Sequence, residues 1–134
     1  MSGRRPRSSS ESGQALVELA LTLPVLLLCA ALLVTLSLVG VARLATENAA
    51  SEGARMLALT NDDARARAVT AAAAQPLSAE RLHVAIEPAA PPERPRGALV
   101  RVSVTYRLEV PFAFVGLAGI DIAATAARRM EYVR

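Results

Sequence analysis

The chain has 134 residues, of which 53% are hydrophobic and only 3% aromatic, and its formal net charge is +3. This length allows one small domain beside a membrane segment, and because much of the apolar share is alanine, its core is expected to be thin. A charge this small argues against a nucleic-acid-binding surface. The only cysteine, Cys29, excludes an intramolecular disulfide.

An uncharged apolar run extends from Leu19 to Ala42. At 1.5 Å per residue its about 24 residues can cross a hydrocarbon core of about 30 Å. The run is too long for a cleaved secretory signal, and Arg4 and Arg5 lack the closely following apolar residues of a twin-arginine signal. Three arginines precede the run, so a single-pass helix with a cytoplasmic N-terminus and an extracytoplasmic C-terminal part is expected.

Two residues near the start of this run are unusual. Pro24 removes a backbone donor, which predicts either a bend or a looser first turn close to the helix start. Glu18 places a carboxylate at the hydrocarbon edge, which is costly unless it reaches the headgroup layer, is protonated or finds a positive partner. Helix physics alone favours the headgroup layer.

The stretch from Glu11 to Pro24, ESGQALVELALTLP, resembles the N-terminus of TadE-like proteins, which are minor pseudopilins of the tight-adherence (Flp, type IVb) pilus system. The alanine-rich stretch from Glu47 to Arg55 resembles the segment that follows the span in that family. The resemblance implies that a prepilin-type peptidase cuts the basic leader between Gly13 and Gln14. Glu18 is then the fifth residue of the product. Leucine follows it here, whereas phenylalanine or tyrosine is common in the family.

The resemblance further implies a non-enzymatic, minor pilin-like membrane subunit for assembly of an Flp pilus or a related secretion apparatus. The partners that the resemblance implies are the lipid bilayer, the prepilin-type peptidase, other pilin or pseudopilin subunits and the pilus assembly platform. After the cut, Glu18 lies about 6 Å along the helix from the new amino terminus at Gln14, and can pair with that group of a neighbouring subunit. Incorporation into a pilus and retention in the membrane are both open.

Two other functions also stay open on the sequence. A permanently membrane-anchored extracytoplasmic sensor or adaptor keeps its basic segment and does not need Gly13. A binding module recruits a partner through the connection from Pro88 to Gly97, which has four prolines and is expected to be exposed and polyproline-like.

Helical character continues past the membrane run to about Leu59, with small residues recurring every three or four positions. Gly53 lies on this small-residue stripe, which predicts that another element, most simply the sheet, packs closely there. A second helix is expected to start at a capping Thr60 or Asn61 with two acids in its first turn, and to end near Gln75 before Pro76. The two acids are interpreted as capping residues and not as metal ligands.

Beyond Pro76, apolar residues recur at every second position. Alternation predicts strands over 82–86 and 100–110, paired as an antiparallel hairpin. Residues 112–119 are expected to form an apolar turn or short helical segment that lies on the membrane surface or on the core. For residues 120–131 the family resemblance favours a third strand, whereas the local propensity also suits a helix.

The sequence therefore predicts an α+β, pilin-like fold: a long N-terminal transmembrane helix, a second helix and a small antiparallel sheet of two or three strands. The expected parts are a basic leader (1–13), a transmembrane and protruding helix (14–59) and a small extracytoplasmic domain (60–134). No catalytic, cofactor-binding or metal-binding constellation is recognisable; the lone histidine, His83, is expected to be solvated. Neither a cofactor nor a small-molecule substrate is expected.

Overall fold

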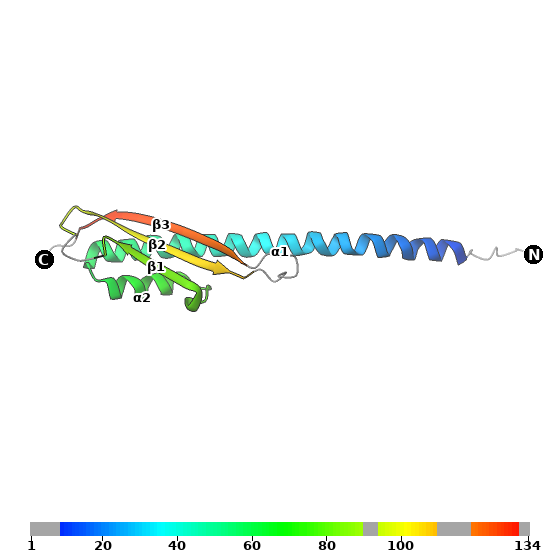
Figure 1. The fold of residues 1–134 in the computed structure, drawn as a ribbon, viewed down its shortest axis with the longest axis horizontal. Coiled ribbons are helices and arrows are strands. Elements are labelled where there is room, and N and C mark those ends of the chain that lie inside the picture. The colour runs from blue at the N-terminus through cyan, green and yellow to red at the C-terminus, as the bar shows by residue number, and fades with distance from the viewer. Residues whose placement is uncertain (1–8, 90–93, 110–118, 132–134) are drawn as a thin grey trace, which may run out of the picture. The chain divides into compact units, whose positions relative to one another are not determined.

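The computed structural model describes residues 9–89, 94–109 and 119–131, with side chains from Gly13 onward. Figure 1 shows the elements, which in chain order are α1 (Ser9–Thr60), α2 (Asp63–Ala73), a 3-10 turn η1 (Ala79–Arg81), β1 (Leu82–Glu87), β2 (Leu99–Leu108) and β3 (Ile120–Arg129). A long apolar helix, a second helix and an antiparallel sheet confirm the predicted α+β fold. The chain divides into two compact units, Met1–Leu36 and Ser37–Arg134, and α1 runs through both. The expected division into a leader (1–13), a long helix (14–59) and a small domain (60–134) remains a prediction.

Pro24 lies inside α1 and not near its start. The helix begins at Ser9 and continues on both sides of the proline. The alternative of a first-turn proline is therefore wrong, because about four helical turns precede it. Proline costs a helix one backbone hydrogen bond, and the long apolar run on either side still favours helix.

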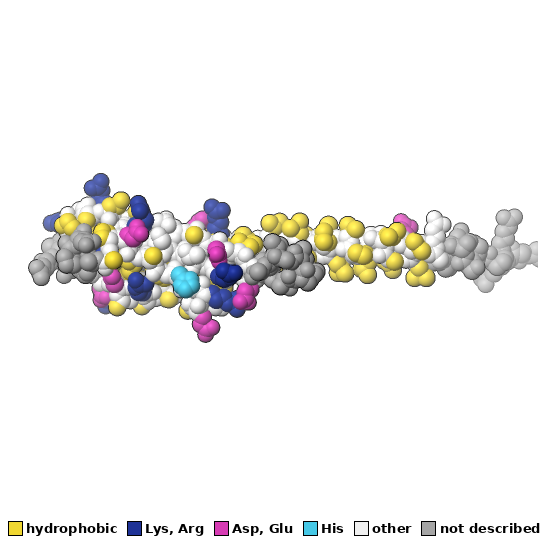
Figure 2. Space-filling view, in the orientation of Figure 1, with side chains coloured by type: hydrophobic (Ala, Val, Ile, Leu, Met, Phe, Trp, Pro, Cys, Tyr) yellow, Lys and Arg dark blue, Asp and Glu magenta, His cyan; other side chains and the backbone are white. Residues whose placement is uncertain are grey.

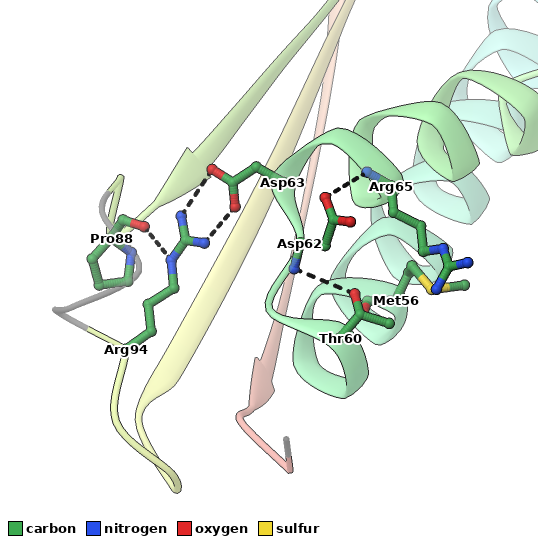
Figure 3. Close-up of polar contacts among 7 residues, drawn as sticks. All are labelled: Met56, Thr60, Asp62, Asp63, Arg65, Pro88 and Arg94. Atoms are coloured by element: carbon green, nitrogen blue, oxygen red, sulfur yellow. Dashed lines mark hydrogen bonds and ion pairs between the residues drawn. The ribbon is translucent and has the colours of Figure 1, made fainter. Parts of the chain in front are cut away.

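The junction between α1 and α2 uses the polar residues 60–63, although not in the predicted roles. Asn61 follows the last residue of α1 and has a positive φ of 50°. Its backbone N–H donates to the Leu57 carbonyl at 2.9 Å. The cap of α2 is Asp62, whose Oδ1 accepts from the Arg65 amide at 3.1 Å (Figure 3). The prediction of a cap at Thr60 or Asn61 is thus wrong, since Asn61 serves the preceding helix. α2 ends at Ala73, slightly before the expected Gln75.

The sheet has the order β1-β2-β3 and is antiparallel throughout. Val104 of β2 lies opposite Val84 of β1 and Ala124 of β3, so the predicted hairpin is confirmed. Pairing of β3 with the whole of β2 also decides between strand and helix for residues 120–131. The alanines of β3 favour a helix, but they form a strand because every residue of β2 pairs with a residue of β3. Residues 112–118 lie outside the described part of the chain.

The core lies between one face of the sheet and the C-terminal part of α1. Val100, Val102 and Val104 of β2 are fully buried, as is Leu57 of α1. Alanines supply most of the helix side of this cluster, which are Ala49, Ala50, Ala54 and Ala58. Small side chains let the helix approach the sheet closely, as the predicted thin core requires.

Gly53 is the closest point of this packing. A Cβ at Gly53 would lie 2.1 Å from Oγ1 of Thr70 and 3.4 Å from Cγ1 of Val102. The small-residue stripe thus marks close packing as predicted. The nearest neighbour nevertheless belongs to α2, whereas the sheet was expected to be closest.

Candidate functional site

The first candidate surface is the apolar part of α1. Large apolar side chains from Leu16 to Leu36 are exposed, and within the helix from Gly13 onward only 6% of the most apolar stretch is buried. Figure 2 shows apolar side chains along this stretch and charged side chains of both signs over the C-terminal unit. A core helix of a soluble protein would be mostly covered. By length and composition α1 can therefore cross a membrane.

The residues predicted for processing, Gly13 and Gln14, are helical and exposed. Apart from its chain neighbours and the backbone of its own helical turns, no described atom lies within 4 Å of the place where a Cβ on Gly13 would be, and the backbone is not in the left-handed region. Packing within the described chain therefore gives no reason for glycine at this position.

Glu18, predicted for assembly, is exposed among apolar neighbours such as Val17 and Leu19. Its backbone carbonyl accepts a hydrogen bond from Oγ1 of Thr22 at 2.8 Å. Within the described part of the chain its carboxylate has no ion-pair partner. Gln14, Glu18 and Thr22 are spaced by four residues, so they form one polar stripe at the start of the apolar helix.

A comparison of the sequence with known protein families matches the residues of this surface. The model of the TadE-like protein family matches residues 13–55, which include Gly13, Gln14, Glu18 and the alanine-rich stretch up to Arg55. Residues 13–55 are a TadE-like segment. The predicted resemblance is confirmed for these residues, which include the apolar part of a helix long enough to cross a membrane. Searches of curated proteins and of solved structures gave no significant match.

A second polar cluster lies in the C-terminal unit, outside the TadE-like segment. Arg94 is only 3% exposed, and its guanidinium pairs with both carboxylate oxygens of Asp63 (Figure 3). Its Nε donates to the Pro88 carbonyl at 2.6 Å. The bidentate contact ties the connection between β1 and β2 to the N-terminus of α2.

The Arg94 contact corrects one expectation. The connection from Pro88 to Gly97 is not exposed throughout, because Arg94 is buried on Asp63; residues 90–93 lie outside the described part of the chain. The carboxylate of Asp63 serves an ion pair, and no group of metal-ligating residues occurs among the residues described. No local sequence signal reveals this pair, since its partners are 31 positions apart.

The outer face of the sheet shows cross-strand polar pairs and no catalytic arrangement in its described strands. Arg101 pairs with Glu87 at 3.6 Å, Arg107 with Asp121 at 3.7 Å, and the hydroxyls of Ser103 and Thr125 are 3.1 Å apart. His83 is exposed on this face, as predicted. These pairs stabilise strand register and do not converge on one point.

An open hollow of about 450 Å³ lies between α1 and the end of β3. Its lining residues are Glu52, Arg55, Ala58, Leu59, Arg128 and Glu131. Glu52 and Arg55 contact each other at 3.8 Å, and the two acidic and two basic residues balance in charge. An open hollow with balanced charge lacks the convergent polar groups of a small-molecule site.

Proposed function

We propose that this chain is a non-enzymatic, minor pilin-like membrane subunit that acts in assembly of an Flp (type IVb) pilus or a related secretion apparatus. The observation that carries the proposal is the TadE-like match over residues 13–55, on a helix whose apolar side chains are uncovered. The N-terminus is proposed to be cytoplasmic and the C-terminal unit extracytoplasmic, in accord with the arginines that precede the span.

Processing between Gly13 and Gln14 by a prepilin-type peptidase belongs to this proposal. Both residues are exposed, and Gly13 has no packing role among the described residues. A peptidase cleft takes up an extended backbone, so the first turns of α1 must open before the cut. Glycine makes this opening easier by about 1 kcal/mol relative to alanine, and its lack of a side chain allows close approach.

Glu18 is the proposed assembly residue. Its carboxylate lies among apolar side chains without a partner in the described chain, an arrangement that is costly in a membrane. The new amino terminus at Gln14 lies about 6 Å from Glu18 along the helix axis, so a neighbouring processed subunit shifted by that amount brings its positive charge to the depth of Glu18. Pairing the two charges removes the cost of each and fixes the axial register between subunits.

The test of this assembly role is a pull-down from native membranes of cells that express the pilus system. Glu18→Ala is expected to leave membrane insertion unchanged and to reduce recovery of partner subunits at least about tenfold, as loss of a buried charge pair predicts. Glu52→Ala, which removes a carboxylate of the same helix that is 43% exposed, is the matched control and should behave as the original chain. Equal partner recovery for Glu18→Ala and Glu52→Ala would contradict the assigned role of Glu18.

A further inference from the structure

One end of the sheet packs beside a defined level of α1. Tyr106, Leu108 and Ile122 form a cluster with Ala42, and Val39 and Ile120 pack against it. The register places Leu108 opposite Ile120, so this is where β2 ends and β3 begins. The arrangement lies wholly within the C-terminal unit, which starts at Ser37.

The side of α1 that the sheet leaves uncovered at this level carries three large apolar side chains beside the exposed ion pair of Arg43 with Glu47. Leu38 is 39% exposed, Val41 is 49% exposed and Leu44 is 70% exposed. Leaving three large apolar side chains in bulk water forgoes the gain from their burial. This level of the helix therefore suits a lipid environment.

The sheet at the same level carries charges. Arg81 pairs with Glu109 at 3.2 Å and Arg107 pairs with Asp121 at 3.7 Å, and all four side chains are at least 42% exposed. Such charges are excluded from hydrocarbon. The headgroup layer is the one part of a bilayer that accepts apolar helix side chains and arginines at the same depth.

We propose that this end of the sheet is immersed in the headgroup layer of the bilayer, where Arg81 and Arg107 bind lipid phosphate groups. The proposal rests on the membrane function proposed above and adds a second lipid contact beyond the helix itself. Arginine matches phosphate with paired hydrogen bonds, and the exposed pairs with Glu109 and Asp121 are weak enough to exchange.

Depth can be measured because Cys29 is the only cysteine. The full chain is reconstituted in vesicles of phosphatidylethanolamine and phosphatidylglycerol, and a bimane fluorophore is attached at one cysteine. Two variants in a Cys29→Ser background, Ala123→Cys and Ala127→Cys, place the label on the exposed outer face of β3. The two sites differ by about 13 Å along the strand. The original Cys29 reports on the helix.

Lipids with a nitroxide on the headgroup should quench the label at position 123 strongly and the label at position 127 weakly. Lipids with a nitroxide deep in the acyl chain should quench the label on Cys29. Quenching at Cys29 without quenching at position 123 would overturn this inference alone. It would show that the sheet stands clear of the bilayer, or that another protein chain covers Leu38, Val41 and Leu44. No quenching at Cys29 would overturn the membrane function as well.

A second arm tests the arginines. Combining Arg81→Gln with Arg107→Gln should reduce headgroup quenching at position 123, whereas the two lysine replacements should retain most of it. Arg129→Gln, an exposed arginine at the far end of β3, is the matched control and should change nothing. Unchanged quenching in the double glutamine variant would overturn the assignment of phosphate binding to Arg81 and Arg107.

Discussion

Gly53 shows how one absent side chain brings two helices together. Thr70 of α2 is fully buried, and its hydroxyl donates to the Ala66 carbonyl at 2.8 Å, so it is held where a Cβ on Gly53 would be. The sequence predicted close packing at this stripe of α1. It did not identify the neighbour, because contacts between α1 and α2 depend on the angle of their connection and not on either helix alone.

Gly53→Ala is expected to lower the free energy of unfolding of the C-terminal unit by about 1–3 kcal/mol, since overpacking forces Thr70 to move. Adding Thr70→Ala should recover part of that loss by removing the clashing hydroxyl. Urea unfolding in detergent, followed by tyrosine fluorescence, measures both. Gly40→Ala is the control. Gly40 lies in the same helix, and apart from its chain neighbours and that helix's own backbone no described atom lies within 4 Å of the added methyl, so the change should be neutral or slightly stabilising.

The ion pair of Arg94 with Asp63 predicts an asymmetric response to substitution. Asp63→Asn leaves a buried guanidinium without a counter-charge and should destabilise the fold by about 3–5 kcal/mol. Arg94→Gln leaves a carboxylate that is 34% exposed and can be hydrated, so its cost should be smaller. Thermal unfolding of the two variants in detergent compares them. A larger loss for Arg94→Gln would contradict the account of the buried charge.

At the scale of elements, most of the secondary structure could be predicted. The strands follow from alternation of apolar residues, and Val100, Val102 and Val104 do face the core. The ends of the helices were harder to predict, because residues 60–63 carry signals both for the end of α1 and for the start of α2. Only the backbone shows that Asn61 adopts a positive φ and leaves the cap to Asp62.

Asp62→Ala tests the cap. Loss of its hydrogen bond to the Arg65 amide should cost about 1 kcal/mol of stability, within a range of about 0.5–2 kcal/mol. Ser78→Ala is a matched control, since Ser78 precedes η1 without making a side-chain capping hydrogen bond. Thermal melts of the two variants should therefore differ, and equal melting temperatures would show that Asp62 does not stabilise α2.

At the scale of the whole molecule, the TadE-like segment and the long apolar helix could be predicted because both are carried by consecutive residues from Gly13 to Arg55. The contacts of the C-terminal unit could not, because Arg94 reaches Asp63 across 31 positions. The functional account depends on Gly13 and Glu18, which have no structural task within the described residues.

The central claim is pilin-type processing, and it is tested most directly by the intact mass and N-terminal sequence of the protein purified from its native membrane. The account predicts a chain that starts at Gln14 and a mass that lacks residues 1–13. Gly13→Gln should abolish this product because a side chain blocks the close approach of the backbone to the peptidase. A start at Met1 or Ser2, in cells with an active prepilin peptidase, would contradict the account and indicate a permanently anchored domain.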